Sequence, residues 1–337
     1  MLCGDCCRKC ADCDEYFPND ADGGSNIDDE WVCASCDESY TTCGECNAVV
    51  ACDESYYDEA TERTLCPSCR DSAVESELIH DHDHKPRARF FGGGGASTFY
   101  FGVELEVERN GCIGHDTAIA DSGIAARDEL YCKADGSLDD GFEIVSHPCT
   151  WEYWRTKFDL EYMEWLRKNR YRSYDTSTCG MHVHVSRSAL GKRDILRLHR
   201  FFRDNQTLIV RLSRRKPGAL AEWSRLALHD NRTLARTIKG YDNEDRSRYT
   251  AINLTNMCTI EFRLFRGTLA KRGFIRNLSL VVALCAFVKK NKLMTDRAFR
   301  DWLRANGAAV LGEPEATDLL QWVTGAVNGM VPADIAA

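Results

Sequence analysis

The sequence of 337 residues has little proline, 7 residues in all, and lacks long apolar runs. No run approaches the roughly 18 apolar residues that suggest a membrane span. The longest, residues 278–288, is flanked by basic side chains and predicts a buried helix. The first residues contain neither the basic nor the apolar stretch of a secretory signal. We therefore expect a cytoplasmic protein with no membrane contact.

Basic side chains are scarce at the start of the chain. Residues 1–84 carry 22 acidic and 4 basic side chains, whereas the whole chain has a formal charge of −9, which leaves +9 for the remainder. Because phosphate contacts need Lys and Arg, the acidic part argues against nucleic-acid binding. It could instead recruit a basic protein partner. The basic remainder suits an anionic ligand, such as a nucleotide or an acidic substrate.

Cysteine is abundant, and 12 of the 18 cysteines lie between Cys3 and Cys69. The pattern CxxC-x19-CxxC occurs twice, displaced by 33 residues. Without a secretory signal, this spacing favours metal binding over disulfides, and two sets of four thiolates predict two tetrahedral zinc sites. The intervening segments are too polar to build a core, so zinc would supply much of the folding energy. The predicted ligands are Cys10, Cys13, Cys33 and Cys36 for the first site and Cys43, Cys46, Cys66 and Cys69 for the second.

The assignment of ligands to sites has two solutions. We choose sequential sets, in which each repeat holds its own ion, over a cross-braced arrangement. Four cysteines are left over, and their irregular spacing does not predict a third site. These are Cys3, Cys6, Cys7 and Cys52.

The chain divides into a zinc domain at 1–71, a flexible linker at 72–98 that contains four consecutive glycines, and a folded domain at 99–330. Periodicity predicts an α+β fold for the last part, with a largely antiparallel sheet and helices packed on one face. The predicted strands are 100–108, 142–146, 181–186, 249–254 and 258–265. The predicted helices are 151–168, 192–213, 219–238, 273–289, 296–306 and 315–323.

Three of these strands carry unusual polar rows. Because side chains alternate between the faces of a strand, Glu104 and Glu106 share one face, and His182 and His184 share another. A half-exposed sheet also produces alternation. Carboxylates a few ångströms apart, however, repel by about 4 kcal/mol per pair at 4 Å and a dielectric near 20, so a converging cluster would require cations. Carboxylates with imidazole suit Mg²⁺ or Mn²⁺.

Further charged residues could complete such a site. Asp135 precedes the strand that bears Glu143 by a short loop, which makes it a plausible additional ligand. The last two strands bring Glu261 together with several arginines, whose fixed donors suit phosphate oxygens. Metals and arginines together are typical of phosphoryl transfer, although ion pairing at the surface would also explain the arginines. The arginines are Arg248, Arg263 and Arg266.

Four segments carry a resemblance to a known superfamily. The stretch GMHVHVS at 180–186 resembles the GMHxHxS motif of glutamine synthetases, and ELE at 104–106 resembles the Glu-x-Glu strand that opens the same catalytic domain. The segment EFR at 261–263 resembles its late Glu-x-Arg strand. Asp135 and Glu143 resemble a pair of acidic ligands in glutamate–cysteine ligases. In this order the segments, within residues 86–290, are most similar to the amidoligases of bacteria and bacteriophages.

The resemblance implies a glutamine-synthetase-like fold and an ATP-dependent carboxylate–amine ligase. ATP would phosphorylate a small-molecule or peptide carboxylate, and an amine would then displace phosphate to form an amide. By position, two or three Mg²⁺ or Mn²⁺ ions would be held by Glu104, Glu106, Asp135, Glu143, His182 and Glu261. His184, Arg248 and Arg263 would contact the nucleotide, and the catalytic set would comprise Glu104, Glu106, Arg263 and Arg266.

The resemblance does not extend to the substrate, because the residues that bind glutamate or ammonia in better-known relatives are not recognisable. Two other functions stay open from the residues. One is a metal-dependent hydrolase built on His182 and His184, which would need further histidines. The other is a zinc-dependent adaptor with an inactive ligase domain.

Overall fold

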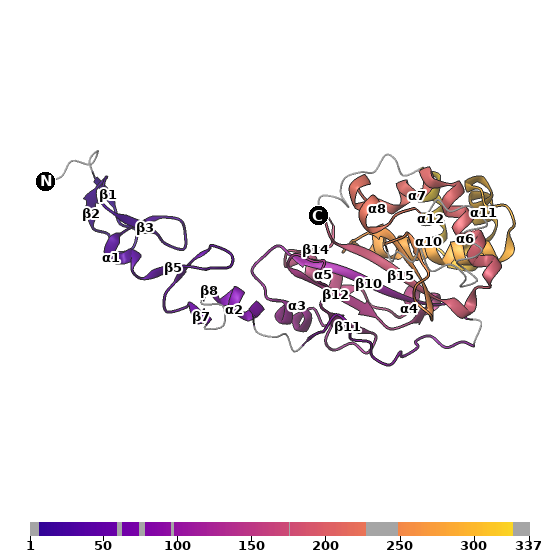
Figure 1. The fold of residues 1–337 in the computed structure, drawn as a ribbon, viewed down its shortest axis with the longest axis horizontal. Coiled ribbons are helices and arrows are strands. Elements are labelled where there is room, and N and C mark those ends of the chain that lie inside the picture. Colours follow the sequence, from indigo (N-terminus) through magenta and orange to yellow (C-terminus); the bar gives the residue numbers. More distant parts are fainter. Residues whose placement is uncertain are drawn as a thin grey trace. The chain divides into compact units, whose positions relative to one another are not determined.

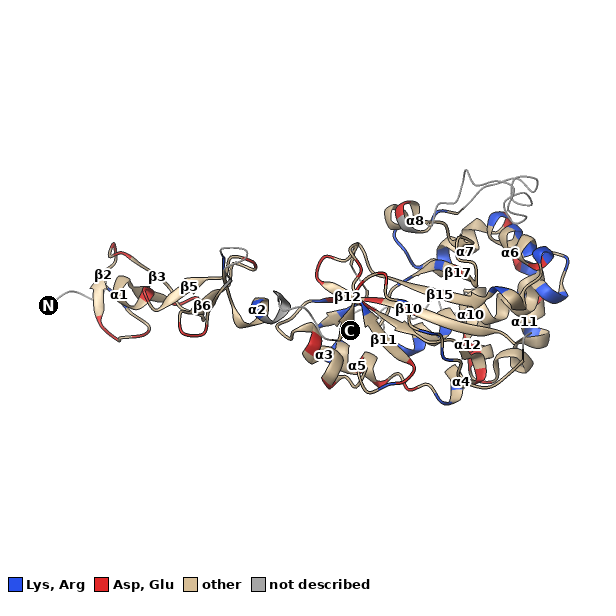
Figure 2. Ribbon diagram, turned by 60° about the horizontal axis from the view of Figure 1, so that its bottom comes forward, with Lys and Arg blue, Asp and Glu red and all other residues tan. Residues whose placement is uncertain are grey.

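A computed structural model describes residues 7–58, 63–73, 78–95, 98–174, 176–226 and 249–325. The chain forms two units, Met1–Glu77 with Cys112–Thr117 and Leu78–Gly111 with Ala118–Ala337, and each is considered by itself. Figure 2 shows acidic side chains along the loops of the first unit and basic ones on helices of the second. None of the helices in the described ranges combines the length and apolar character that crossing a bilayer requires.

The first unit consists of short antiparallel hairpins that repeat with the cysteines (Figure 1). The backbone N–H of Asp14 donates to the carbonyl of Cys10, and that of Asn47 donates to Cys43, 33 residues later. Both residues have left-handed backbone angles, φ 64° and 59°, which Asp and Asn tolerate better than most residues do. The elements are β1 (Cys7–Lys9), β2 (Tyr16–Pro18), β3 (Gly23–Ser25), β4 (Trp31–Cys33), α1 (Ala34–Asp37), β5 (Tyr40–Thr42), β6 (Val49–Ala51), β7 (Tyr56–Asp58), β8 (Arg63–Leu65) and α2 (Pro67–Ala73).

The second unit is built on a nine-stranded sheet, which confirms the predicted α+β fold. Its main path runs β16-β17-β15-β10-β12-β11-β9, and the short strands β13 and β14 also pair with β10. Every pairing is antiparallel except that of β9 with β11. The strands are β9 (Ile79–His80), β10 (Tyr100–Arg109), β11 (Leu130–Lys133), β12 (Gly141–Ser146), β13 (Cys149–Thr150), β14 (Tyr171–Arg172), β15 (Gly180–Ser186), β16 (Ile252–Asn253) and β17 (Thr259–Arg266).

Helices pack on the apolar face of this sheet. The Asn277 amide of the long helix α10 lies 3.5 Å from the Met181 sulfur of β15, and Trp154 of α4 donates to the Phe101 carbonyl of β10. The helices are α3 (His115–Asp121), α4 (Trp151–Thr156), α5 (Glu161–Lys168), α6 (Lys192–Asp204), α7 (Gln206–Ser213), α8 (Pro217–Trp223), α10 (Lys271–Lys290), α11 (Asp296–Leu311), α12 (Glu315–Thr324) and the 3-10 turn Arg187–Ala189.

Two predicted helices are divided. The predicted helix 151–168 is interrupted before α5, where the Asp159 carboxylate accepts the N–H of Glu161. The predicted helix 192–213 divides at Asn205, whose side-chain amide donates to carbonyls of Phe201 and Met294. The second break depends on a segment 89 residues away, so helical periodicity could not reveal it.

Other boundaries also differ from the sequence prediction. The predicted helix 219–238 begins as α8 at Pro217, and its part beyond residue 226 lies outside the described residues. The predicted strand 249–254 is reduced to β16. Strand β9 lies within 72–98, which the sequence predicts as a linker, because a strand of two residues carries no periodic signal. Strand β11 and helix α3 were missed for a similar reason, since both are short.

Candidate active site

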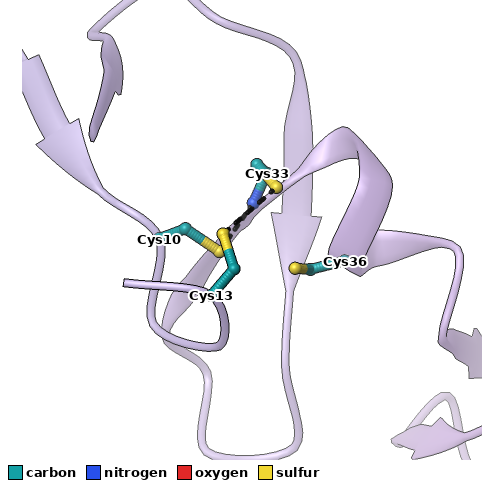
Figure 3. A group of neighbouring side chains, drawn as sticks. All are labelled: Cys10, Cys13, Cys33 and Cys36. Atoms are coloured by element: carbon teal, nitrogen blue, oxygen red, sulfur yellow. Dashed lines mark hydrogen bonds between the residues drawn. The ribbon is translucent and has the colours of Figure 1, made fainter. Parts of the chain in front are cut away.

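Each cysteine repeat gathers its own four thiols in the first unit. In both sets the sulfur atoms lie within 4.8 Å of one another, which matches the sequential arrangement and not the cross-braced one. Figure 3 shows the first set, Cys10, Cys13, Cys33 and Cys36, converging from two turns. The second set is Cys43, Cys46, Cys66 and Cys69.

The thiols have the acidity expected of metal ligands. Burial alone would raise the pKa of Cys10, but backbone N–H donors, among them that of Cys33 at 3.3 Å, lower this pKa to about 6. Cys43 occupies the equivalent place and its pKa is likewise about 6. Thiolates are the form that binds zinc. Cys52 is exposed and joins neither set, and Cys3 and Cys6 lie outside the described residues.

A second group of ionisable side chains gathers on the polar face of the large sheet. Strand register places them directly across from one another: Glu104 faces His182, Glu106 faces Glu143, and His184 faces Glu261. Opposed residues of antiparallel strands point to the same face. The sheet thus brings together the residues that the sequence predicted as metal ligands, although their atoms come from four strands and one loop.

Three overlapping groups have their ligand atoms within 4.8 Å of one another. Two ligands on opposite sides of a magnesium ion, each about 2.1 Å from it, would be about 4.2 Å apart, so the spacing and the oxygen-rich chemistry fit such ions. Glu104 and Glu143 each belong to two groups. The groups are Glu104, Glu143 and His182; Glu104, His184 and Glu261; and Glu106, Asp135 and Glu143.

The electrostatics of this face are those of crowded like charges. Burial and the neighbouring Glu104 raise the pKa of Glu143 well above its ordinary value. Burial would also raise the pKa of Glu104, but His184 and His182 on either side lower it well below the ordinary value. Burial lowers the pKa of His184, yet the charge of Glu104 outweighs it and raises this pKa to about 9. A site with such opposed shifts is typical of functional centres.

The two histidines are held in different ways. The Nδ1 atom of His182 lies 3.3 Å from the Glu104 carboxylate, and its Nε2 atom lies 3.8 Å from Glu106. His184 is fixed by Thr259, whose hydroxyl lies 3.0 Å from Nδ1, so that Nε2 lies 3.3 Å from Glu104.

The predicted arginines have separate positions. Arg263 donates to Glu261 at 2.8 Å, while its Nε is buried without a partner among the described residues. Arg266 stacks on the Tyr174 ring, 3.4 Å from its centroid. Arg248, predicted as a nucleotide contact, lies outside the described residues.

A β-bulge in β17 decides where Arg266 points. Between Met181 and Val183 of β15, the partner strand advances from Phe265 to Phe262, one residue more than regular pairing requires. Arg266 therefore faces Gly180, on the side of His182. Strict alternation from Glu261 would have put it on the opposite face, so the sequence offered no means of placing it.

Sequence reasoning missed two cationic residues at this face. Lys133 of β11 lies across from Glu143 and contacts its carboxylate at 2.9 Å. Arg215 is 8% exposed and has no carboxylate within ion-pair distance among the described residues. A Cβ atom on Gly180 would lie 2.2 Å from its Nη2 atom, so this guanidinium occupies the space that glycine leaves open. Only the basic run 214–216 hinted at it.

Glu108, which continues the row of glutamates, joins none of the three groups among the described residues. It is 2% exposed, accepts a hydrogen bond from the Thr178 hydroxyl and lies 4.0 Å from Arg172. These contacts give it a structural role.

The fold and the polar face together define an α+β domain equipped with a cation-binding, acidic centre flanked by arginines. A family model described as "putative amidoligase enzyme" matches residues 88–285, and the chain belongs to this family. The match contains the whole polar face and excludes the cysteine unit. A search of curated proteins found no match to the chain.

Proposed function

We propose that this protein is an ATP-dependent carboxylate–amine ligase that forms an amide through an acyl phosphate. The observation that carries the proposal is the convergence of Glu104, Glu106, Glu143, His182 and Glu261 on one sheet face. Membership of the amidoligase family supports a ligase, and the basic charge of the second unit suits anionic reactants.

The proposed reaction has two balanced steps. A carboxylate oxygen of the acid attacks the γ-phosphorus of ATP, the bond to the β-phosphate oxygen breaks, and ADP leaves. The amine nitrogen then attacks the acyl carbon, the carbon–oxygen bond to phosphate breaks, and the nitrogen loses a proton as the amide forms. Mg²⁺ or Mn²⁺, when bound, would neutralise phosphate charge in the first step.

The residues of the chain have assigned roles in this proposal. The three carboxylate groups would hold the divalent ions, with His182 as the imidazole ligand. His184, with its pKa of about 9, is protonated near neutral pH and can contact a phosphate oxygen. Arg263 and the buried Arg215 would stabilise charge on the transferring phosphoryl group, because charge-assisted hydrogen bonds are strong in a site closed to water. The cysteine unit would bind two zinc ions and serve stability or recruitment.

Amine-stimulated release of phosphate from ATP tests the function. Candidate acids and amines are combined with the full-length protein, ATP and Mg²⁺ or Mn²⁺, and amide product is followed by mass spectrometry. Glu104→Gln should abolish product while the thermal unfolding temperature stays within a few degrees of the wild type. Turnover that survives this change, or ATP binding that ignores divalent ions, would refute the proposal.

A further inference from the structure

A cavity of about 260 Å³ lies where three elements of the second unit meet, and none of the roles above uses it. It is bordered by Asn110 after β10, by the segment that joins α5 to β14 and continues beyond it, and by the residues that precede α10. The cavity is large enough for a small organic group but not for a nucleotide.

The lining is strongly basic. Three arginines contribute to it, and no aspartate or glutamate does so among the described residues. Arg167 and Arg170 make no ion pair with any carboxylate in the described ranges, and Arg172 approaches only Glu108, at 4.0 Å. Arginines that crowd one cavity repel each other, so an anionic occupant would stabilise them.

The beginning of α10 adds a second source of positive potential. This helix has 20 residues, and its first-turn N–H groups have no partners within the helix. Its N-cap residue, Ala270, lines the cavity and has no side-chain oxygen to cap them. The positive end of the helix macrodipole is therefore open to an anion.

A buried hydroxyl without a partner points to a ligand independently of the helix. Ser173 lines the cavity and is 1% exposed, yet its Oγ atom has no hydrogen-bond partner among the described residues. A buried hydroxyl left unpaired costs roughly 1–3 kcal/mol. A carboxylate oxygen in the cavity would accept this hydrogen bond.

The cavity is linked to the polar face described above. Arg172 pairs across from Glu108, and Glu108 is two residues along β10 from Glu106, a distance of about 7 Å. Tyr174, which lines the cavity, carries the stacked guanidinium of Arg266. One small molecule could therefore reach both places.

We propose that this cavity binds a carboxylate of the acid substrate other than the one that is activated, so that the substrate class is a di- or polycarboxylic acid. This inference rests on the proposed ligase function for its meaning. The binding of an oxyanion by the cavity can be measured without turnover. Inorganic phosphate shares this chemistry and provides the comparison.

The test measures binding of glutarate and of inorganic phosphate to the full-length protein, without nucleotide or divalent ions. Arg170→Asn is the central variant, because Arg170 has φ 60° and asparagine tolerates that angle where alanine does not. Arg297→Asn removes the same charge from a side chain that is 92% exposed. Arg167→Gln, on the surface of α5, serves if the first variant does not fold.

We expect Arg170→Asn or Arg167→Gln to weaken glutarate binding at least about ten-fold, since a charged hydrogen bond contributes that much. Arg297→Asn and Glu104→Gln should bind as the wild type does. Absence of glutarate binding in the wild type, equal binding by the variants, or dependence on Arg170 for phosphate alone would overturn the proposal.

The two proposals fail in different ways. Turnover of an acid whose KM is unchanged in Arg170→Asn would refute the cavity and keep the ligase. Glutarate binding that depends on Arg170, in a protein that turns over no acid with ATP, would support the cavity and refute the ligase.

Discussion

Glu106→Gln separates the stability of the polar face from its ability to bind cations. The side chain of Glu106 is 4% exposed, lies across from Glu143, and belongs to a group whose oxygens are within 4.8 Å of one another. Two full charges 4.8 Å apart repel by about 3–4 kcal/mol at an effective dielectric near 20. Glutamine keeps an oxygen to accept the N–H of Gly180.

The loss of repulsion offsets the loss of attraction to nearby cations such as Arg215. We therefore expect the metal-free variant to be at least as stable as the wild type. Losing a ligand should lower the affinity for Mg²⁺ or Mn²⁺ by about 100-fold. At a metal concentration 100 times the wild-type Kd, stabilisation then falls from about 2.7 to about 0.4 kcal/mol.

Thermal unfolding with and without Mn²⁺ measures this difference. A wild-type rise of about 5–10 °C should shrink to about 1 °C in the variant. Glu222→Gln, an exposed position on α8, should keep the full rise. An undiminished rise in Glu106→Gln, or a metal-free variant several kcal/mol less stable than the wild type, would refute the reasoning.

Three further predictions concern pH, packing and zinc. The folded pKa of His184, about 9, exceeds its ordinary 6.5, so its contribution of at most about 3 kcal/mol is complete below pH 6.5 and lost as pH rises to 9. Denaturant unfolding of the metal-free protein should show this fall, and His184→Gln should flatten it. Gly180→Ala should displace Arg215 and lower amide formation at least about ten-fold, with little loss of stability because the clash is with the end of a flexible side chain. Chromophoric chelator titration should detect two zinc ions per chain, one in Cys43→Ser and two in Cys52→Ser.

Each of these has an outcome that contradicts it. Stability that is constant or rises from pH 6.5 to 9 would show that His184 is not held protonated by Glu104. Gly136→Ala is the matched control for the packing prediction, because nothing lies within 4 Å of its added Cβ. Equal activity of both alanine variants would remove Arg215 from the site. Zinc content that is unchanged in Cys43→Ser would refute the grouping of the cysteines.

The sequence by itself determined the features that depend on neighbours along the chain. Two CxxC pairs separated by 19 residues are enough to define a four-cysteine set, and the structure groups Cys10 with Cys33 and Cys43 with Cys66 accordingly. Alternation along a strand likewise fixed the shared face of Glu104 and Glu106. Four motifs in order also predicted the family, and the family match confirms that prediction.

Only the tertiary structure decided which rows meet and what lies between them. The register of β10 against β12 sets Glu106 against Glu143, and the bulge in β17 turns Arg266 toward Gly180. Lys133 and Arg215 reach the face from a four-residue strand and from a helix end, neither of which has a periodic pattern. Register, bulges and such approaches depend on contacts between segments far apart in the chain, and local periodicity carries no record of those contacts.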